Sequence, residues 1–242
     1  MTRGLPVSGR VAWWGTAWLR GDAAPDDVID ALHLGELPHT VSGLDEEAGP
    51  LLGGLAALRQ RGATAFGAAF PVEGDPVGLG GPVAFNAAAL EAGEAVVAID
   101  GGTGLVPVRV GPTYQWSALD AGRRQLPDVG EADRGLRAAL LEAAHLLAGL
   151  DVAAWRPEVA DELLNLRRVS ALPAAPGVPA RCVDLAARAL QALGIAELAL
   201  QDDGGAITAA EAEARRAAII PLDRAGRRAL TAACSPEVWP PG

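Results

Sequence analysis

The chain has 242 residues, half of them apolar, and its 30 acidic and 20 basic residues give a formal net charge of −10. This length and apolar content allow a sizeable core and argue against disorder, whereas the acidic balance disfavours nucleic acid and membranes as partners. All the basic residues are Arg, and a chain without Lys cannot use a Walker-type phosphate loop, the usual protein-kinase site or Schiff-base chemistry.

The first predicted helix covers residues 9–20, where Val11, Trp14 and Trp18 line one side at helical spacing. Three of the six Trp residues fall between Trp13 and Trp18. We expect this cluster to belong to the core, because a soluble protein seldom exposes three indoles. A partner-binding surface is the alternative interpretation.

Two further helices are expected on either side of a short strand or turn at 38–43. Residues 25–34 begin with Pro and two Asp, which is typical of a helix N-terminus. Residues 50–60 are followed by a glycine that suits a C-cap. His33 and His39 are six residues apart, which is not a helical metal-ligand spacing, so we predict no metal site.

The centre of the chain has the pattern of a small mixed sheet. A strand at 64–70, a helix at 83–92 and a strand at 95–99 follow one another, and this order predicts a parallel pair with a right-handed crossover. A glycine-rich turn then predicts a hairpin that returns as an antiparallel strand at 105–110. With a further short strand at 113–118, the expected sheet has three or four strands covered by helices.

The polar residues 120–128 mark the expected boundary between a mixed α/β region, 1–124, and a helical region, 125–242. Whether the two regions pack together as one domain stays open. The expected helices of the second region begin after Asp128 and then cover 157–168, 180–201 and 208–233. Pro221 should kink the last of them, because it removes a backbone donor. The predicted fold is therefore a helix-rich α/β (α+β) fold that ends in a helical bundle.

Cys182 and Cys234 lie in predicted helices without a paired spacing, which indicates neither a disulfide framework nor a zinc knuckle. The sequence has no apolar stretch of signal-peptide length at its N-terminus and no run that could span a bilayer. We expect a cytoplasmic protein without a cofactor. Arg pairs such as Arg123 and Arg124 have acidic residues nearby and are interpreted as solvated.

The loop 71–82 is the strongest candidate for a functional segment, because it is long, rich in Gly and Pro, and lies between a predicted strand and a predicted helix. Its glycines would let backbone amides approach a ligand, and the next helix would direct its N–H groups and positive dipole end towards that ligand. The glycine spacing does not match the dinucleotide fingerprint. We expect a small polar or anionic molecule here, with the candidate ligand-binding residues Asp75, Gly78, Gly80, Gly81 and Asn86. A rigid structural connection is the alternative.

Three classes of function are compatible with these patterns. The leading interpretation is a non-catalytic protein that binds a small ligand or a partner at the loop 71–82. The second is an enzyme acting on a small polar metabolite, with Glu73, Asp75 and Asn86 near the reacting groups. The third is a structural or homo-oligomeric interaction protein that uses the Trp13–Trp18 helix or a face of the bundle.

Overall fold

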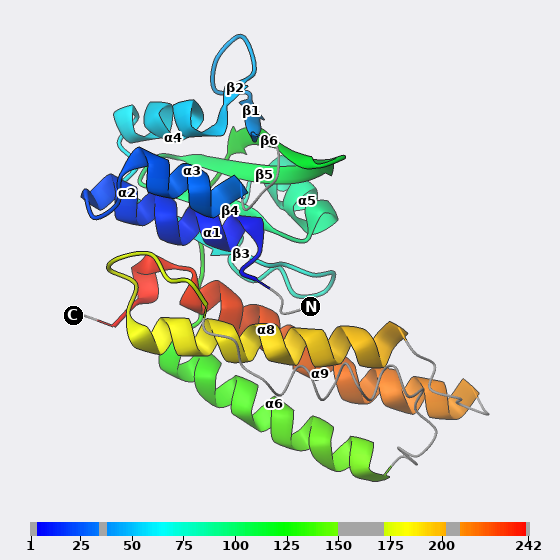
Figure 1. The fold of residues 1–242 in the computed structure, drawn as a ribbon. Coiled ribbons are helices and arrows are strands. Elements are labelled where there is room, and N and C mark those ends of the chain that lie inside the picture. Colours follow the sequence, from blue (N-terminus) through cyan, green and yellow to red (C-terminus); the bar gives the residue numbers. More distant parts are fainter. Residues whose placement is uncertain (1–3, 34–37, 150–171, 202–208, 241–242) are drawn as a thin grey trace.

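The computed structural model describes residues 4–33, 38–149, 172–201 and 209–240 (Figure 1). A mixed α/β region occupies one part of the molecule, and long helices of the second region pack against it. This architecture confirms the helix-rich α/β fold with C-terminal helices. The helix predicted at 157–168 lies outside the described residues.

The N-terminal helices form one continuous rod that is made of α1 (Val7–Arg10), the π-helical turn η1 (Val11–Gly15) and α2 (Thr16–Arg20). The rod confirms the helix predicted at 9–20. Trp13 is completely buried, and Trp14 and Trp18 are half-buried against core side chains. The tryptophan cluster therefore packs in the core.

The remaining elements of the first region lie within two residues of their predicted bounds, except β2, which was not predicted. They are α3 (Pro25–His33), β1 (Thr40–Ser42), β2 (Gly49–Pro50), α4 (Leu51–Gln60), β3 (Ala65–Ala69), α5 (Val83–Ala92), β4 (Ala95–Ile99), β5 (Thr103–Val110) and β6 (Thr113–Asp120). The sheet has six strands in the order β2-β1-β6-β5-β4-β3, not three or four. The undercount has a physical cause: β1, expected at 38–43 as a strand or a turn, has three residues, and β2 has two, so neither shows enough alternation to identify a strand.

The pairing of β3 with β4 shows that the predicted parallel crossover is wrong. The two strands are antiparallel, with Ala69 opposite Ala95. The loop 71–82 makes the outward leg of the connection and reaches Gly122, whose N–H donates to the Gly81 carbonyl (2.7 Å). Helix α5, about 15 Å long for its ten residues, then returns the chain to the end where β3 finished.

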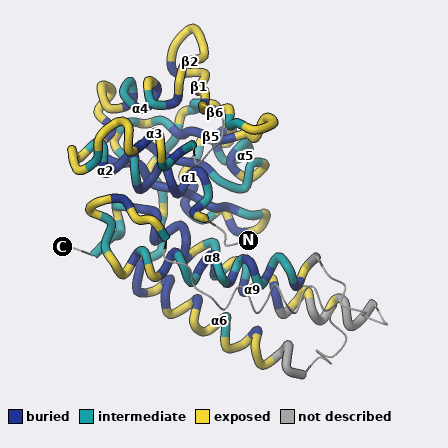
Figure 2. Tube along the Cα trace, viewed as in Figure 1, coloured by how far each residue is buried: buried dark blue, intermediate teal, exposed yellow. Residues whose placement is uncertain are grey.

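Successive side chains of a strand point to opposite faces of the sheet and so divide the core between two faces. Figure 2 shows that buried residues gather at the centre of the first region, where the strands lie. On β4, Ala95 and Val97 pack with Phe85 of α5. Val96 and Ala98 point the other way and join the cluster formed with α1, α3 and α4. The sheet is therefore a central layer with α5 on one side and the N-terminal helices on the other.

The described helical region consists of α6 (Val129–Gly149), α8 (Ala180–Gln201), α9 (Ala209–Ala233) and the 3-10 turn η3 (Pro236–Val238). Asp128 caps α6, because its Oδ1 accepts the N–H groups of Gly130 (2.8 Å) and Glu131 (3.2 Å). Helix α9 continues through Pro221 as one helix. Among the described helices, none is long and apolar enough to cross a membrane, and the cytoplasmic location stays a prediction.

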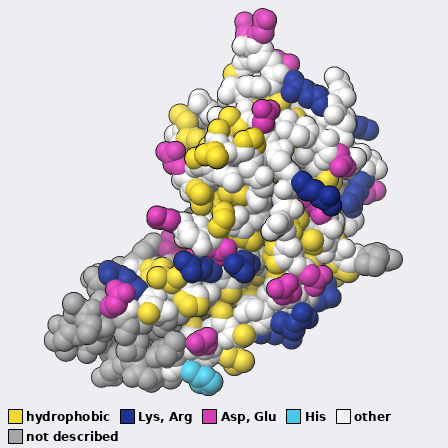
Figure 3. Space-filling view, turned by 180° about the vertical axis from the view of Figure 1, so that it is seen from behind, with side chains coloured by type: hydrophobic (Ala, Val, Ile, Leu, Met, Phe, Trp, Pro, Cys, Tyr) yellow, Lys and Arg dark blue, Asp and Glu magenta, His cyan; other side chains and the backbone are white. Residues whose placement is uncertain are grey.

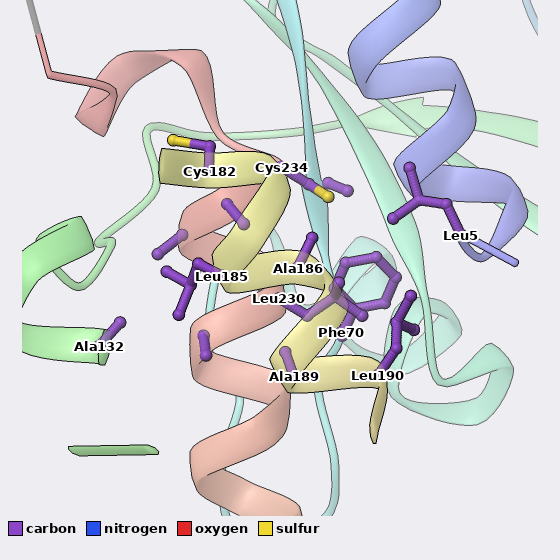
Figure 4. Close-up of a cluster of buried hydrophobic side chains, with 14 of the residues drawn as sticks. Leu5, Phe70, Ala132, Cys182, Leu185, Ala186, Ala189, Leu190, Leu230 and Cys234 are labelled. Atoms are coloured by element: carbon purple, nitrogen blue, oxygen red, sulfur yellow. The ribbon is translucent and has the colours of Figure 1, made fainter. Parts of the chain in front are cut away.

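One hydrophobic cluster joins the two regions (Figure 4). Phe70, which follows β3, lies beside Leu190 of α8 and Leu230 of α9, and Leu5 approaches from the N-terminal side. Trp13 adds a hydrogen bond across the same junction, because its indole Nε1 donates to the Ala233 carbonyl (3.2 Å). The bundle is thus fixed to the sheet by apolar and polar contacts together.

The edge of the sheet at β3 is closed by hydrogen bonds from outside the sheet. Two amides of β3 and that of the next residue have partners: Phe66 N–H donates to Thr16 Oγ1 (2.9 Å), Ala68 N–H to the Cys234 carbonyl (2.9 Å) and Phe70 N–H to Thr231 Oγ1 (3.2 Å). The Thr16 hydroxyl also donates to the Phe66 carbonyl (3.0 Å). Unpaired amides on an edge strand are a template for aggregation. The end of α9 accepts two of the hydrogen bonds at this edge, so it protects the sheet as well as forming part of the bundle.

Candidate functional site

Asp75 anchors the loop 71–82 to the helical region. Its carboxylate is buried, with 7% of the side chain exposed, and accepts from Nε and Nη2 of Arg228 on α9 at 2.8 and 2.9 Å. This bidentate geometry is the strong form of an ion pair, and the hydrogen bonds raise the pKa of Arg228 above its ordinary value. Both oxygens of Asp75 are therefore used within the protein.

Gly78 and Gly80 bring the loop close to its neighbours. A Cβ at Gly78 would lie 2.8 Å from Cγ2 of Thr231, and Gly78 has a φ of +78°, which side chains rarely adopt. A Cβ at Gly80 would overlap the carbonyl group of Arg123. These glycines let the loop backbone pack against α9 and against the segment 121–126.

Gly81 and Asn86 connect the loop to the start of α5. The Gly81 N–H donates to Oδ1 of Asn86 (2.9 Å), and the Gly81 carbonyl accepts from the N–H of Gly122. The Asn86 side chain thus ties the end of the loop to the first turn of α5.

Glu73, the third residue of the catalytic alternative, is exposed at the turn of the loop. The carboxylate of Asp75 is directed at Arg228, and the side-chain oxygen of Asn86 is directed at the backbone of Gly81. The two candidates with described partners therefore point to different places. The structure does not bring the three side chains together around one reacting centre.

A cavity of about 650 Å³ lies beside the loop, on the other side of the segment 121–126. Its lining comes from the end of β4 and the turn after it, from that segment, and from η3. The lining residues are Val97, Ala98, Ile99, Asp100, Gly102, Ala121, Gly122, Arg123, Arg124, Leu126, Glu237 and Val238. Because Gly80 and Gly81 contact the backbone of Arg123 and Gly122, the loop supports one wall of this cavity.

Arg124 forms the fixed polar part of the cavity. Its side chain is 2% exposed and makes bidentate contacts with Glu237 of η3 at 2.7 and 2.8 Å. It also donates to the Ala68 carbonyl of β3 (3.0 Å). The guanidinium lies over Gly67, where any side chain would overlap it. The expectation that this Arg is solvated is wrong, because the side chain is buried and bonded.

Two charged residues of the cavity, Asp100 and Arg123, were missed by the sequence reasoning. Asp100 has a φ of +64°, outside the region that most side chains adopt, and its Oδ2 accepts from the Thr64 hydroxyl (2.7 Å). Arg123 makes no hydrogen bond or ion pair with any residue that the structure describes. Two sequence features could have indicated these residues: the Asp-Gly-Gly turn contains Asp100, and the Arg pair contains Arg123.

The surface carries charges of both signs on the face shown in Figure 3. Basic and acidic side chains alternate over both regions, and no broad field of a single sign dominates this view. Steering of a large polyanion needs clustered positive charge. The charge pattern of this face fits recognition by a few local groups better than binding through a broad electrostatic field.

Comparison with known proteins places both regions in one family. Residues 8–132 match the model described as Rv1486c-like protein, N-terminal domain, and residues 130–231 match the model described as Rv1486c-like protein, C-terminal domain. The chain is 27% identical to the uncharacterized protein Rv1486c of Mycobacterium tuberculosis strain H37Rv over 278 aligned positions, covering 94% of this chain and 96% of the relative. The uncharacterized protein MT1533 of strain CDC 1551 matches with the same identity and coverage. No solved structure matches the chain.

Proposed function

The chain belongs to the Rv1486c-like protein family, and from that premise we propose that it binds a small polar molecule in the cavity between β4, the segment 121–126 and η3. We also propose that the regions 1–124 and 125–242 are two domains. The cavity then lies at their junction, which is a common place for ligand sites.

The observation that carries this proposal is the combination of volume and free charge in the cavity. A volume of about 650 Å³ falls within the range of small-molecule sites, about 300–1,000 Å³. The lining includes apolar side chains such as those of Val97 and Ile99, while Asp100 and Arg123 supply polar groups. Small-molecule sites combine apolar lining with a few oriented polar groups, and this cavity has both kinds of lining.

The loop 71–82 contributes to this proposed site as its support. Gly80 and Gly81 contact the backbone that carries Arg123, while Asn86 and Asp75 hold the two ends of the loop. The loop residues predicted from the sequence therefore support the proposed site from behind its wall. Asp75 and Asn86 would not touch the ligand. An enzyme built on Glu73, Asp75 and Asn86 is the weaker alternative, because Asp75 and Asn86 have partners elsewhere.

A thermal-shift screen of polar metabolites tests the proposal. We expect at least one compound to raise the melting temperature of the wild-type protein, because a ligand that binds the folded state stabilises it by mass action. Ile99→Trp should abolish that shift, since Ile99 lines the cavity and the indole would fill the space. Ile220→Trp is the matched control, because Ile220 is exposed on α9 and lies outside the cavity lining.

Two results would count against the proposal. A broad screen without any stabilising compound would remove its main support. A compound that stabilises Ile99→Trp as well as the wild type would place binding somewhere else on the protein. A third variant, Gly80→Ala, should weaken the shift partly, because the new methyl group would push against the Arg123 carbonyl and displace the wall.

A further inference from the structure

The cavity contains four ionisable side chains, and two of them neutralise each other. Arg124 and Glu237 form a bidentate pair in which the Arg side chain is 2% exposed. Their charges are therefore already compensated within the protein. The charges available to a ligand belong to Asp100 and Arg123, which line the same cavity.

Asp100 presents a carboxylate to the cavity that no cation of the described residues pairs with. Its partner is the hydroxyl of Thr64 (2.7 Å), which is neutral and so orients the carboxylate without cancelling its charge. Asp100 follows the end of β4 with a left-handed backbone, a conformation that Asp and Asn tolerate better than other residues with side chains. The hydrogen bond from Thr64 thus orients this exposed carboxylate on the cavity lining.

Arg123 supplies the opposite charge, and it does not pair with Asp100. Within the described part of the chain, its guanidinium has no ion-pair partner within 4.0 Å and no hydrogen bond. The backbone beneath it is fixed, because the Gly80 backbone packs against the Arg123 carbonyl. Two opposite charges therefore line one cavity without touching, and the apolar side chains of Ile99, Val97 and Val238 belong to the same lining.

We infer that the ligand is a zwitterion with an apolar body, of the class of an amino acid or short peptide with free termini. This inference rests on the proposed binding function. The ligand carboxylate would pair with the guanidinium of Arg123, which is suited to bidentate carboxylate recognition. The ligand ammonium would pair with Asp100. A simple anion would leave Asp100 unpaired and a simple cation would leave Arg123 unpaired, so each would use half of the polar lining.

Calorimetry with matched probes tests the inference. Leucine and leucyl-leucine carry both charges, the N-acetylated forms lack the ammonium group, and the amidated forms lack the carboxylate. We expect at least one zwitterion to bind, and each blocked form of it to bind about 10- to 100-fold more weakly, the value of one hydrogen-bonded charged contact. The length of the better zwitterion distinguishes an amino acid from a peptide.

Two variants assign the ends of the ligand. Arg123→Gln should weaken the zwitterion and its N-acetylated form alike, whereas Asp100→Asn should weaken the zwitterion and leave the N-acetylated form unchanged. Asn tolerates the left-handed backbone and can still accept from Thr64, so Asp100→Asn should fold normally. Circular dichroism of both variants checks the fold.

The outcomes separate the inference from the proposed function. If other metabolites stabilise the protein through the cavity but neither zwitterion binds, the inference falls and the binding function stands. If the N-acetylated probe binds as tightly as its zwitterion and Asp100→Asn has no effect, the site is an anion site and the inference is again refuted. If no compound of any class binds, both fail together.

Discussion

Replacing Arg228 with Ala should destabilise the protein more than replacing Asp75 with Ala, although both changes break the same ion pair. The reason is the unequal burial of the two partners. The side chain of Asp75 is 7% exposed, while that of Arg228 is 57% exposed. Loss of Arg228 leaves a buried carboxylate without its partner, whereas loss of Asp75 leaves a guanidinium that water can solvate.

The burial of each partner sets the expected magnitudes. A buried pair broken from one side costs about 3–5 kcal/mol, and the partial exposure of Arg228 puts the cost of Arg228→Ala near the lower end, at about 3 kcal/mol. Asp75→Ala resembles the loss of an exposed pair and should cost about 1 kcal/mol. The difference of about 2 kcal/mol corresponds to roughly 4–8 °C in melting temperature for a chain of this size.

Urea unfolding followed by tryptophan fluorescence measures this difference. Two of the six Trp residues contribute a signal from the junction, because the indoles of Trp13 and Trp239 both donate to the Ala233 carbonyl at 3.2 and 3.0 Å. Arg224→Ala is the control, since Arg224 is an exposed Arg of the same helix and makes no ion pair with the described residues. Equal losses for Arg228→Ala and Asp75→Ala, or an equal loss for Arg224→Ala, would refute the reasoning from burial.

The remaining predictions concern three other buried groups. Gly67→Ala should lower the free energy of unfolding by about 2–4 kcal/mol in urea titrations, because the methyl group displaces the hydrogen-bonded Arg124 guanidinium. Gly53→Ala is the control and should be neutral or stabilising, because Gly53 faces open space on α4. Burial raises the pKa of Glu94 above its ordinary value near 4.5, so the folded state favours the protonated carboxyl. The protonated form stabilises the fold at low pH, and this stabilisation is lost as pH rises through the raised pKa. Glu94→Gln should therefore melt above the wild type at neutral pH, with a gap that closes below pH 4.5. Burial also raises the pKa of the Cys182 thiol to about 11, so it should resist a thiol reagent at neutral pH until urea is added.

Local sequence patterns predicted the helices and strands well, because each depends on neighbouring residues. Helical spacing placed the N-terminal rod, and the aspartate cap at Asp128 marked the start of α6. The direction of β4 was predicted wrongly. The order strand, loop, helix, strand does not show that the loop 71–82 carries the chain to the other end of β3 and that α5 brings it back. The parallel pairing of β1 with β6 joins residues more than 70 positions apart, and no local signal indicates it.

The candidate site was only partly predictable for the same reason. The loop 71–82 was recognised as special from its glycines and prolines, but its partners lie far along the chain. Asp75 and Arg228 are 153 positions apart, and the cavity combines β4 with η3, which are separated by more than 130 residues. A single sequence shows which backbone positions need glycine, but it does not show which distant side chain will arrive there.

The closure of the β3 edge has a consequence for how the protein is made. Thr231 and Cys234 accept the hydrogen bonds of β3, and they are synthesised long after the strand itself. Until they emerge from the ribosome, the sheet has an open edge on which another strand could add. A chain that ends within α9 before Thr231 would therefore leave the N–H groups of Ala68 and Phe70 without these acceptors.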